Sequence, residues 1–250
     1  MSTYIFPKEY DVIVIGAGHA GVEAALSAAR LECKVAVLTQ NLDTVGQMSC
    51  NPAIGGLGKG HMVREIDALG GAMGLNTDAT GIQFRTLNAS KGPSVRAPRA
   101  QCDKKAYQFR MKHVLENADN VDMHQGNVSE ILVEDDLIVG IVTNLGIEYK
   151  TSSVIVSSGT FMRGLMHVGK QNQSGGRMGD GISTLSDCLK ELGFEVHRFK
   201  TGTPCRLNGR SINLEKCEKQ TGDDRRLAFP LWKATERKLS CLFQQVADLR

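Results

Sequence analysis

Residues 10–21 read YDVIVIGAGHAG, and this stretch decides the fold. The run from Tyr10 to Ile15 is short, apolar and β-branched, which is typical of a strand buried on both faces of a parallel sheet. Residues 22–31 are rich in alanine and other helix formers, and residues 34–39 resume the apolar β-branched pattern. A strand, a helix and a strand within about 30 residues predict a βαβ unit with the glycines at its first turn.

The glycines after the first strand match the Gly-x-Gly-x-x-Gly fingerprint of dinucleotide-binding folds. Gly16 permits a tight turn, Gly18 lets the backbone approach a pyrophosphate, and Gly21 lets the helix pack closely on the strand. The N-terminus of the helix also favours an anion by about 1 kcal/mol. We therefore predict that a dinucleotide binds along Gly16, Ala17, Gly18, His19, Ala20 and Gly21.

One part of the fingerprint is missing. The second strand ends at Thr39-Gln40, where a carboxylate usually binds the ribose hydroxyls, and Asp43 is the nearest acid. Another contact, or Asp43 itself, must replace it. This departure disfavours a simple NAD-dependent dehydrogenase.

Residues 47–56 read QMSCNPAIGG and place Cys50 in a glycine-rich loop soon after the fingerprint. The commonest role of a reduced cysteine is that of a small buried apolar filler, but this loop offers little core to fill. A thiolate is also a strong nucleophile. We therefore predict that Cys50 is a catalytic residue.

Composition bounds the remaining possibilities. The chain has 250 residues, 41% of them hydrophobic, which suffices for a substantial core. No apolar run approaches the roughly 20 residues of a membrane span, and no signal peptide precedes the first strand, so we expect a cytoplasmic protein without a membrane partner. Seven cysteines without a Cys-x-x-Cys pair, and six scattered histidines, predict neither a disulfide framework nor a metal site.

The net charge of +3 is too small to indicate a nucleic-acid partner. Between Arg85 and Lys112, however, eight basic residues stand against the single acid Asp103. This segment either faces phosphates or forms the solvated face of a helix, and charge alone leaves both open.

The periodicity of the remaining chain predicts further elements. We expect helices at 59–69 and 99–117, a strand at 82–87, an antiparallel meander at about 121–150, a return to the parallel sheet near 153–160, a helix ending at Leu192 and a strand at 194–199. Residues 235–249 give only an ambiguous helical pattern. The predicted fold is α/β: a Rossmann-like, doubly wound parallel sheet with an inserted antiparallel β element.

These motifs together resemble the MnmG family, also called GidA, which comprises FAD-binding subunits of the tRNA wobble-uridine carboxymethylaminomethyl modification enzyme. The resemblance covers residues 10–206. It rests on Gly16–Gly21, on Asn41-Leu42-Asp43-Thr44 through Gly56, and on Asp67-Ala68-Leu69-Gly70-Gly71, Asn88-Ala89-Ser90-Lys91-Gly92-Pro93, Arg96, Arg99-Ala100-Gln101, Asp103, Gly159-Thr160-Phe161, Ser174-Gly175-Gly176-Arg177 and Lys200-Thr201-Gly202-Thr203-Pro204. Taken jointly, these motifs are highly specific.

The resemblance implies that FAD binds at Gly16–Gly21, with further contacts at Val128 and Ser183. It implies that NADH reduces the flavin, that methylenetetrahydrofolate supplies a one-carbon unit, and that the product is a carboxymethylaminomethyl group on uridine C5 of tRNA. Cys50 matches one of two functional cysteines of the family, and the basic residues Lys91, Arg96 and Arg99 would meet flavin or tRNA phosphates. The family works as a homodimer together with the GTPase MnmE.

Family members are far longer than this chain. We expect residues 1–213 to form the N-terminal part of the FAD-binding domain, and residues 214–250 to form a divergent or truncated tail, as an early stop or a shifted reading frame would produce. A truncated FAD-binding remnant without activity, and the related folate- and FAD-dependent tRNA uridine methyltransferase, are the alternative functions. The loop around Cys50 favours the first family over the second.

Overall fold

The structure is a computed structural model that describes residues 4–202, 207–224 and 229. The chain divides into two compact units. The first comprises residues 1–49 and 108–203, and the second comprises residues 50–107 and 204–250. Each unit is described by itself below.

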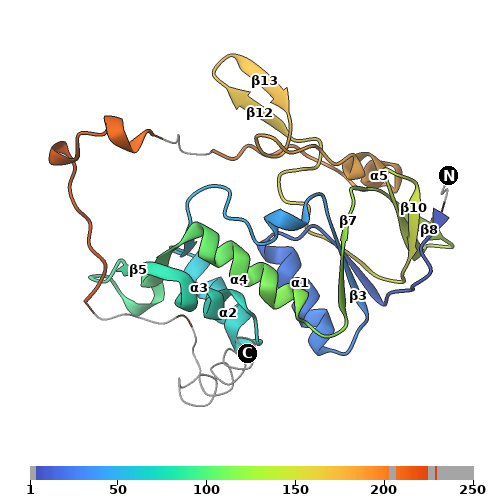
Figure 1. The fold of residues 1–250 in the computed structure, drawn as a ribbon, viewed down its shortest axis with the longest axis horizontal. Coiled ribbons are helices and arrows are strands. Elements are labelled where there is room, and N and C mark those ends of the chain that lie inside the picture. Colours follow the sequence, from blue (N-terminus) through green and yellow to red (C-terminus); the bar gives the residue numbers. More distant parts are fainter. Residues whose placement is uncertain (1–3, 203–206, 225–228, 230–250) are drawn as a thin grey trace. The chain divides into compact units, whose positions relative to one another are not determined.

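The first unit is built on a parallel sheet. Its strands are β2 (Val12–Ile15), β3 (Val35–Thr39), β7 (Val121–Gln125) and β11 (Val154–Val156), in the order β11-β2-β3-β7. Helix α1 (His19–Arg30) connects β2 to β3, so the predicted βαβ unit is confirmed. The buried face of α1 consists mainly of small residues, which let the helix lie close to the sheet (Figure 1).

An antiparallel sheet packs on the opposite face. It contains β1 (Tyr4–Ile5), β8 (Val128–Glu134), β9 (Leu137–Thr143) and β10 (Ile147–Lys150), in the order β1-β10-β9-β8, with β1 parallel to β10. Alternate residues of β2 and β3, such as Ile13 and Leu38, join Ile131 and Ile141 in one buried core. The inserted antiparallel element is therefore confirmed, and with it the α/β fold class.

Two details of the first unit differ from the sequence prediction. Residues 121–125, predicted as the start of the meander, form β7 and pair in parallel with β3, because the chain returns to the sheet after a helical crossover. Residues 194–199, predicted as a strand, have no regular secondary structure. Phe199 is 90% exposed there, and no neighbouring strand offers a partner within the described residues.

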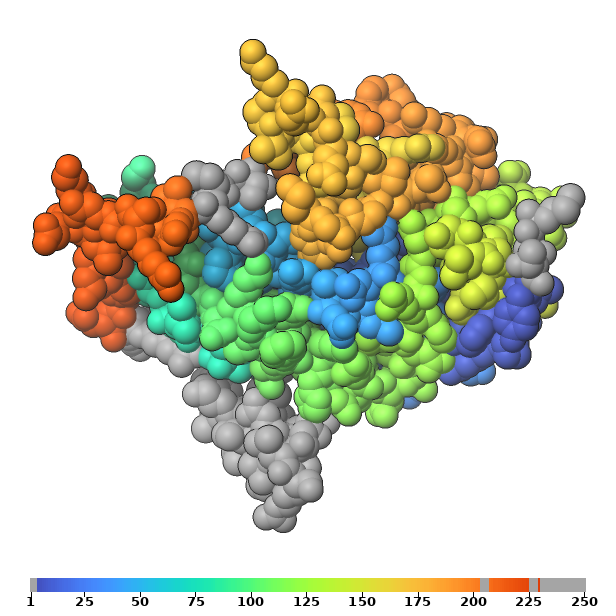
Figure 2. Space-filling view, turned by 45° about the horizontal axis from the view of Figure 1, so that its top comes forward, coloured from blue at the N-terminus to red at the C-terminus, as the bar shows by residue number. Residues whose placement is uncertain are grey.

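The first unit is completed by α5 (Leu185–Glu191) and by a hairpin of β12 (Leu165–Val168) and β13 (Gln171–Ser174). Leu185 and Cys188 of α5 belong to the core beside β8. The hairpin, coloured yellow to gold, projects from the surface of this unit (Figures 1 and 2).

The second unit contains a three-stranded antiparallel sheet of β4 (Ala53–Gly55), β6 (Ala97–Cys102) and β5 (Gly81–Leu87), with helices α2 (Lys59–Ala68) and α3 (Met73–Thr80). The predicted helix at 99–117 is shorter and begins only at Lys104, as α4 (Lys104–Glu116). Asp103 explains the boundary, because its Oδ1 accepts hydrogen bonds of 2.9 Å from the main-chain N–H groups of Lys105 and Ala106 and so caps the helix. Residues 97–102 pair with β5 instead.

A segment far along the chain packs against β5. The main-chain N–H of Asp223 donates to the Phe84 carbonyl at 2.8 Å, and the carboxylate of Asp223 accepts from the N–H of Thr86 at 2.7 Å. Phe229 is fully buried, and its N–H donates to Asp78 at 3.2 Å. The ambiguous helix predicted at 235–249 lies outside the described residues.

Short 3-10 turns complete the described secondary structure. They are η1 (Leu42–Thr44), η2 (Pro93–Val95), η3 (Gly209–Ser211) and η4 (Leu214–Lys216). In the part of the chain that the structure describes, no helix has both the length and the apolar character needed to cross a membrane.

Candidate dinucleotide site at the carboxyl edge of the parallel sheet

The four parallel strands of the first unit end at one edge of their sheet. Gly16 follows β2, Gln40 follows β3, Gly126 follows β7 and Ser157 follows β11. We call this the carboxyl edge. Open α/β sheets bind ligands outside the carboxyl ends of their strands, so this is where the fold itself favours a site.

The glycine loop between β2 and α1 lies at the middle of the carboxyl edge. Gly16 has a φ of +102°, and a β-carbon there would lie 2.6 Å from the Ser157 carbonyl oxygen. Gly18 is different, because its φ is −74° and a β-carbon there would meet no heavy atom within 4 Å. Packing within the described chain thus accounts for Gly16 but not for Gly18, which borders open space as a ligand-facing glycine would.

Helix α1 begins directly after this loop. Gly18 is its N-cap residue and makes no side-chain capping bond, so the first-turn N–H groups receive no cap from it. Ala17 and Gly21 are buried, whereas Gly18 and Ala20 are exposed. Burial lowers the pKa of His19 below its usual value, which favours the neutral imidazole at the start of the helix.

Two buried polar atoms near this loop fit a bound polar cofactor. Ser158 Oγ, just after β11, and Gln47 Oε1, next to the Gly46 that donates to Ala17, have no hydrogen-bond partner among the described residues. Buried polar atoms are rarely left without a partner. A ligand with hydroxyl and phosphate groups at the carboxyl edge, such as FAD, would supply such partners.

Asp43, the acid nearest to the end of β3, is paired with a lysine. Its carboxylate accepts from Lys112 Nζ at 3.1 Å, and this hydrogen bond to Asp43 raises the pKa of Lys112. Gln40, not Asp43, stands at the end of β3, and its amide nitrogen donates to Asn127 Oδ1 at 3.4 Å. Sequence reasoning missed Gln40 and Asn127 as site residues. The available signal was an amide at the strand end where an acid is usual.

Val128 and Ser183 lie together beside this edge. Ser183 Oγ donates to the Val128 carbonyl at 3.3 Å, and Asn127 Nδ2 donates to the Ile182 carbonyl at 2.8 Å. The structure thus brings Val128 and Ser183 next to each other. Gln40, which follows β3, contacts Asn127, the residue before Val128. Val128 and Ser183 are at most 4% exposed, so their side chains are buried beneath the carboxyl edge.

Cys50 lies in the second unit, in the loop before β4, as an exposed free thiol. The preceding residue, Ser49, belongs to the first unit and accepts from Arg177 Nη1 at 3.2 Å. Arg177 is itself held by Asp180, and its guanidinium carbon lies 5.6 Å from the centre of the Phe161 ring. The motif at residues 174–177 thus contacts Ser49, the residue next to the predicted nucleophile.

The basic segment does not form one helix face. Lys91 and Arg96 are exposed in the connection between β5 and β6, where Arg96 Nε donates to the Lys91 carbonyl at 3.0 Å. Arg99 is half-buried within β6, and Arg85 Nη1 donates to Gln220 at 3.0 Å. The alternative of a single solvated helix face is therefore wrong for this part of the segment.

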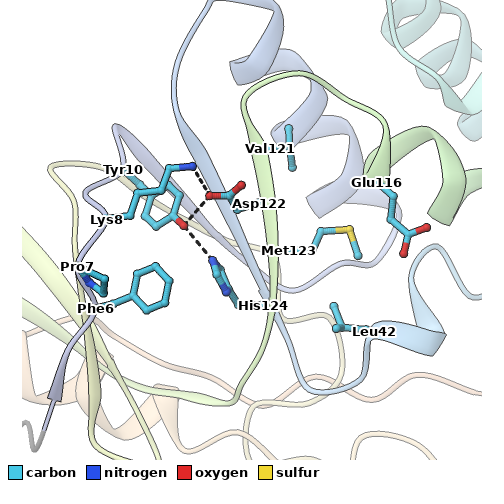
Figure 3. A pocket seen from close by; sticks show the side chains of 10 residues that line it. All are labelled: Phe6, Pro7, Lys8, Tyr10, Leu42, Glu116, Val121, Asp122, Met123 and His124. Atoms are coloured by element: carbon cyan, nitrogen blue, oxygen red, sulfur yellow. Dashed lines mark hydrogen bonds and ion pairs between the residues drawn. The ribbon is translucent and has the colours of Figure 1, made fainter.

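A separate pocket of about 590 Å³ lies along β7 in the first unit (Figure 3). Its lining contains a hydrogen-bonded cluster that sequence reasoning missed. Tyr10 donates to Asp122 at 2.7 Å, and its hydroxyl lies 2.9 Å from His124 Nε2. Lys8 pairs with the same Asp122 carboxylate. The polar groups of this cluster are thus engaged with one another.

Comparison with known proteins shows which family the chain belongs to. The family model described as "Glucose inhibited division protein A" (GIDA) matches residues 11–248. The chain is 56% identical over 238 residues to the tRNA uridine 5-carboxymethylaminomethyl modification enzyme MnmG of Geobacter sulfurreducens; the match covers 95% of this chain and 38% of that protein. The corresponding protein of Geobacter metallireducens is 58% identical over 233 residues, with 93% and 37% covered.

A solved structure agrees with these matches. The crystal structure of Aquifex aeolicus GidA superposes with a TM-score of 0.86 at 52% identity, covering 90% of this chain and 38% of that one. The chain thus spans a little over a third of the length of these relatives. By the extent and identity of these matches, the chain belongs to the glucose inhibited division protein A family, whose members include MnmG.

Proposed function

We propose that this chain is the FAD-binding portion of an enzyme that modifies the wobble uridine of tRNA in the cytoplasm. The carboxyl edge would bind FAD, with the pyrophosphate at residues 16–21 and further contacts near Val128 and Ser183. When bound, the flavin supplies hydride and electron transfer. The full activity would use NADH, methylenetetrahydrofolate and an MnmE-type GTPase partner, in a homodimer.

The observation that carries this proposal is the open side of the glycine loop. Gly18 has neither backbone strain nor a neighbouring atom that requires glycine, and it lies at the uncapped start of α1. An anionic ligand that needs close approach to the backbone accounts for both features. The relatives named as tRNA uridine modification enzymes support the reaction class.

Within this function, Cys50 is proposed as the nucleophile. Pyrimidine C5 becomes reactive when a nucleophile adds at C6, and an exposed thiol is suited to that step. The pair of Ser49 and Arg177 would steady the loop that carries it. Lys91 and Arg96, both exposed, are proposed to meet phosphates of FAD or tRNA.

The experiment that tests the proposal is an FAD titration of the purified chain, followed by its visible absorption spectrum. We expect a bound-flavin spectrum from the unaltered chain. A folded chain that takes up no FAD would contradict the proposal and favour a remnant without a cofactor.

The role of Cys50 needs a separate test in the complete modification assembly. Cys50→Ser should abolish uridine modification while FAD binding remains within about twofold of the unaltered chain. Cys217→Ser is the matched control, since Cys217 is also an exposed free thiol of the second unit. Normal modification by Cys50→Ser would remove Cys50 from the reaction. A methylated uridine as the product of the unaltered assembly would identify the alternative methyltransferase.

A further inference from the structure

The carbonyl groups of the glycine loop are held by atoms outside the loop. The hydroxyl of Ser157 lies 3.0 Å from the carbonyl oxygens of both Ile15 and Gly16, and these two acceptors share its single hydrogen. The next carbonyl along the loop, that of Ala17, accepts from the Gly46 N–H at 2.9 Å. All of these residues belong to the first unit.

This pattern sets the direction of the loop N–H groups. A trans peptide is planar, so its C=O and the following N–H point in opposite directions. Because the Gly16 carbonyl is directed to Ser157, the N–H of Ala17 points away from Ser157. Likewise, the Gly46 contact directs the N–H of Gly18 away from Gly46. The Gly16 N–H is already committed, since it donates to the Leu38 carbonyl at 2.8 Å.

We propose that Ser157 is a positioning residue for cofactor binding: its hydroxyl holds the Gly16–Ala17 peptide so that the Ala17 N–H faces the pyrophosphate. Without this bond, the Gly16–Ala17 peptide loses its side-chain anchor, so a rotation that turns its carbonyl oxygen toward the ligand, where it repels an anion, costs less free energy. The hydroxyl therefore pre-organises the loop before the ligand arrives. This inference rests on the proposed FAD site and adds a residue outside the glycine fingerprint.

The chain offers a matched control at the other end of the same strand pair. The hydroxyl of Thr151 donates to the carbonyls of Asp11 and Ser153, at 3.2 and 3.1 Å, just before β2 and β11 begin. Thr151 thus bridges the amino ends of the two strands as Ser157 bridges their carboxyl ends. Thr151 Oγ1 also accepts from the Ser153 N–H at 3.2 Å, but of the two hydroxyls only that of Ser157 contacts the loop.

The test compares FAD and ADP affinities of Ser157→Ala and Thr151→Val, measured by titration of the full chain, with thermal unfolding of each variant. We expect Ser157→Ala to weaken both ligands about threefold to tenfold, as the loss of one hydrogen bond would. ADP is included because it carries the pyrophosphate without the flavin. Thr151→Val should lower the unfolding temperature at least as much, because the Ser153 N–H also loses its acceptor, and should leave both affinities unchanged.

Ser157→Cys serves if the alanine variant does not fold, because a thiol is nearly the same size but a weaker donor. Its affinity should lie below that of the unaltered chain. Unchanged affinity in a folded Ser157 variant, or an equal loss in Thr151→Val, would overturn this inference alone. Failure of the unaltered chain to bind FAD would overturn the proposed function as well, so the two failures are distinguishable.

Discussion

A β-carbon at position 21 would lie 1.8 Å from the carbonyl oxygen of Gly16. The first turn of α1 therefore packs on the glycine loop with no room for any side chain. The hydroxyl of Ser157 would lie 2.6 Å from the same β-carbon, so relief in that direction is also blocked. Gly21 is required by the protein itself, independently of any ligand.

We expect Gly21→Ala to destabilise the first unit by about 3 kcal/mol or more, because a methyl group in contact with main-chain atoms forces the helix and the strand apart. Chemical denaturation with far-UV circular dichroism measures the effect. If the variant is as stable as the unaltered chain, α1 does not pack as closely on the glycine loop as described.

Gly18→Val should behave in the opposite way. The backbone at Gly18 suits a residue with a side chain and its β-carbon position is empty, so the free energy of unfolding should fall by only about 1 kcal/mol, the cost of a poorer N-cap residue. FAD affinity should fall at least tenfold, because the side chain occupies the space where the pyrophosphate approaches. Equal FAD affinity in a folded Gly18→Val chain would show that the ligand does not pass this residue.

Phe229→Ala tests the second unit. Phe229 is fully buried and packs against the positions of Gly55 and Gly74, so removing its ring should cost about 3–5 kcal/mol. Phe199→Ala is the control, because Phe199 is 90% exposed, and its loss should be nearly neutral. Thermal unfolding and limited proteolysis report the difference. Similar stability of the two variants would place Phe229 outside the core.

The cluster in the pocket along β7 predicts a pH dependence of stability (Figure 3). Burial lowers the pKa of His124, although the charge of Asp122 opposes the shift. The unfolded chain then binds this proton more readily than the folded chain. The free energy of unfolding contributed by His124 is thus intact above the unfolded pKa of about 6.5 and decreases as the pH falls below it.

His124→Gln should therefore lose less stability than the unaltered chain between pH 7.5 and pH 5, as measured by the urea midpoint at each pH. The pKa of Asp122 does not interfere in this window. Burial opposes its ionisation, but the hydrogen bonds from Lys8 and Tyr10 outweigh burial and keep the pKa below its usual value. His167→Gln, at an exposed histidine, is the control. An unchanged pH profile in His124→Gln would exclude His124 as the source.

Local sequence patterns predicted the parallel core well. β2, α1 and β3 each follow from a short apolar run or from alanine-rich sequence next to the glycines, and both α2 and β5 agree with their periodicity. The residues that shape the site were harder to predict. Gln40 and Ser157 act through partners far away in sequence, Asn127 and Gly16, and no local pattern encodes those pairings.

Two of the wrong predictions of secondary structure also arise from pairing between segments that lie apart in the sequence. Residues 97–102 have helix-forming neighbours, but pairing with β5 and the cap at Asp103 decide their conformation. Residues 121–125 were grouped with the antiparallel strands that follow them, although their partner, β3, lies more than eighty residues earlier in the chain. In both cases tertiary pairing overrides local preference.

The division of the chain into two units has a consequence for how it folds during synthesis. The second unit is made of residues 50–107 together with a segment that includes Asp223 and Phe229, and nearly the whole second half of the first unit is translated between them. The ribosome therefore releases every strand of the parallel sheet before Phe229 can fill its place beside Gly55 and Gly74. The core of the second unit therefore stays incomplete until every strand of the first unit's parallel sheet has been synthesised, and during that interval its apolar residues are available to chaperones.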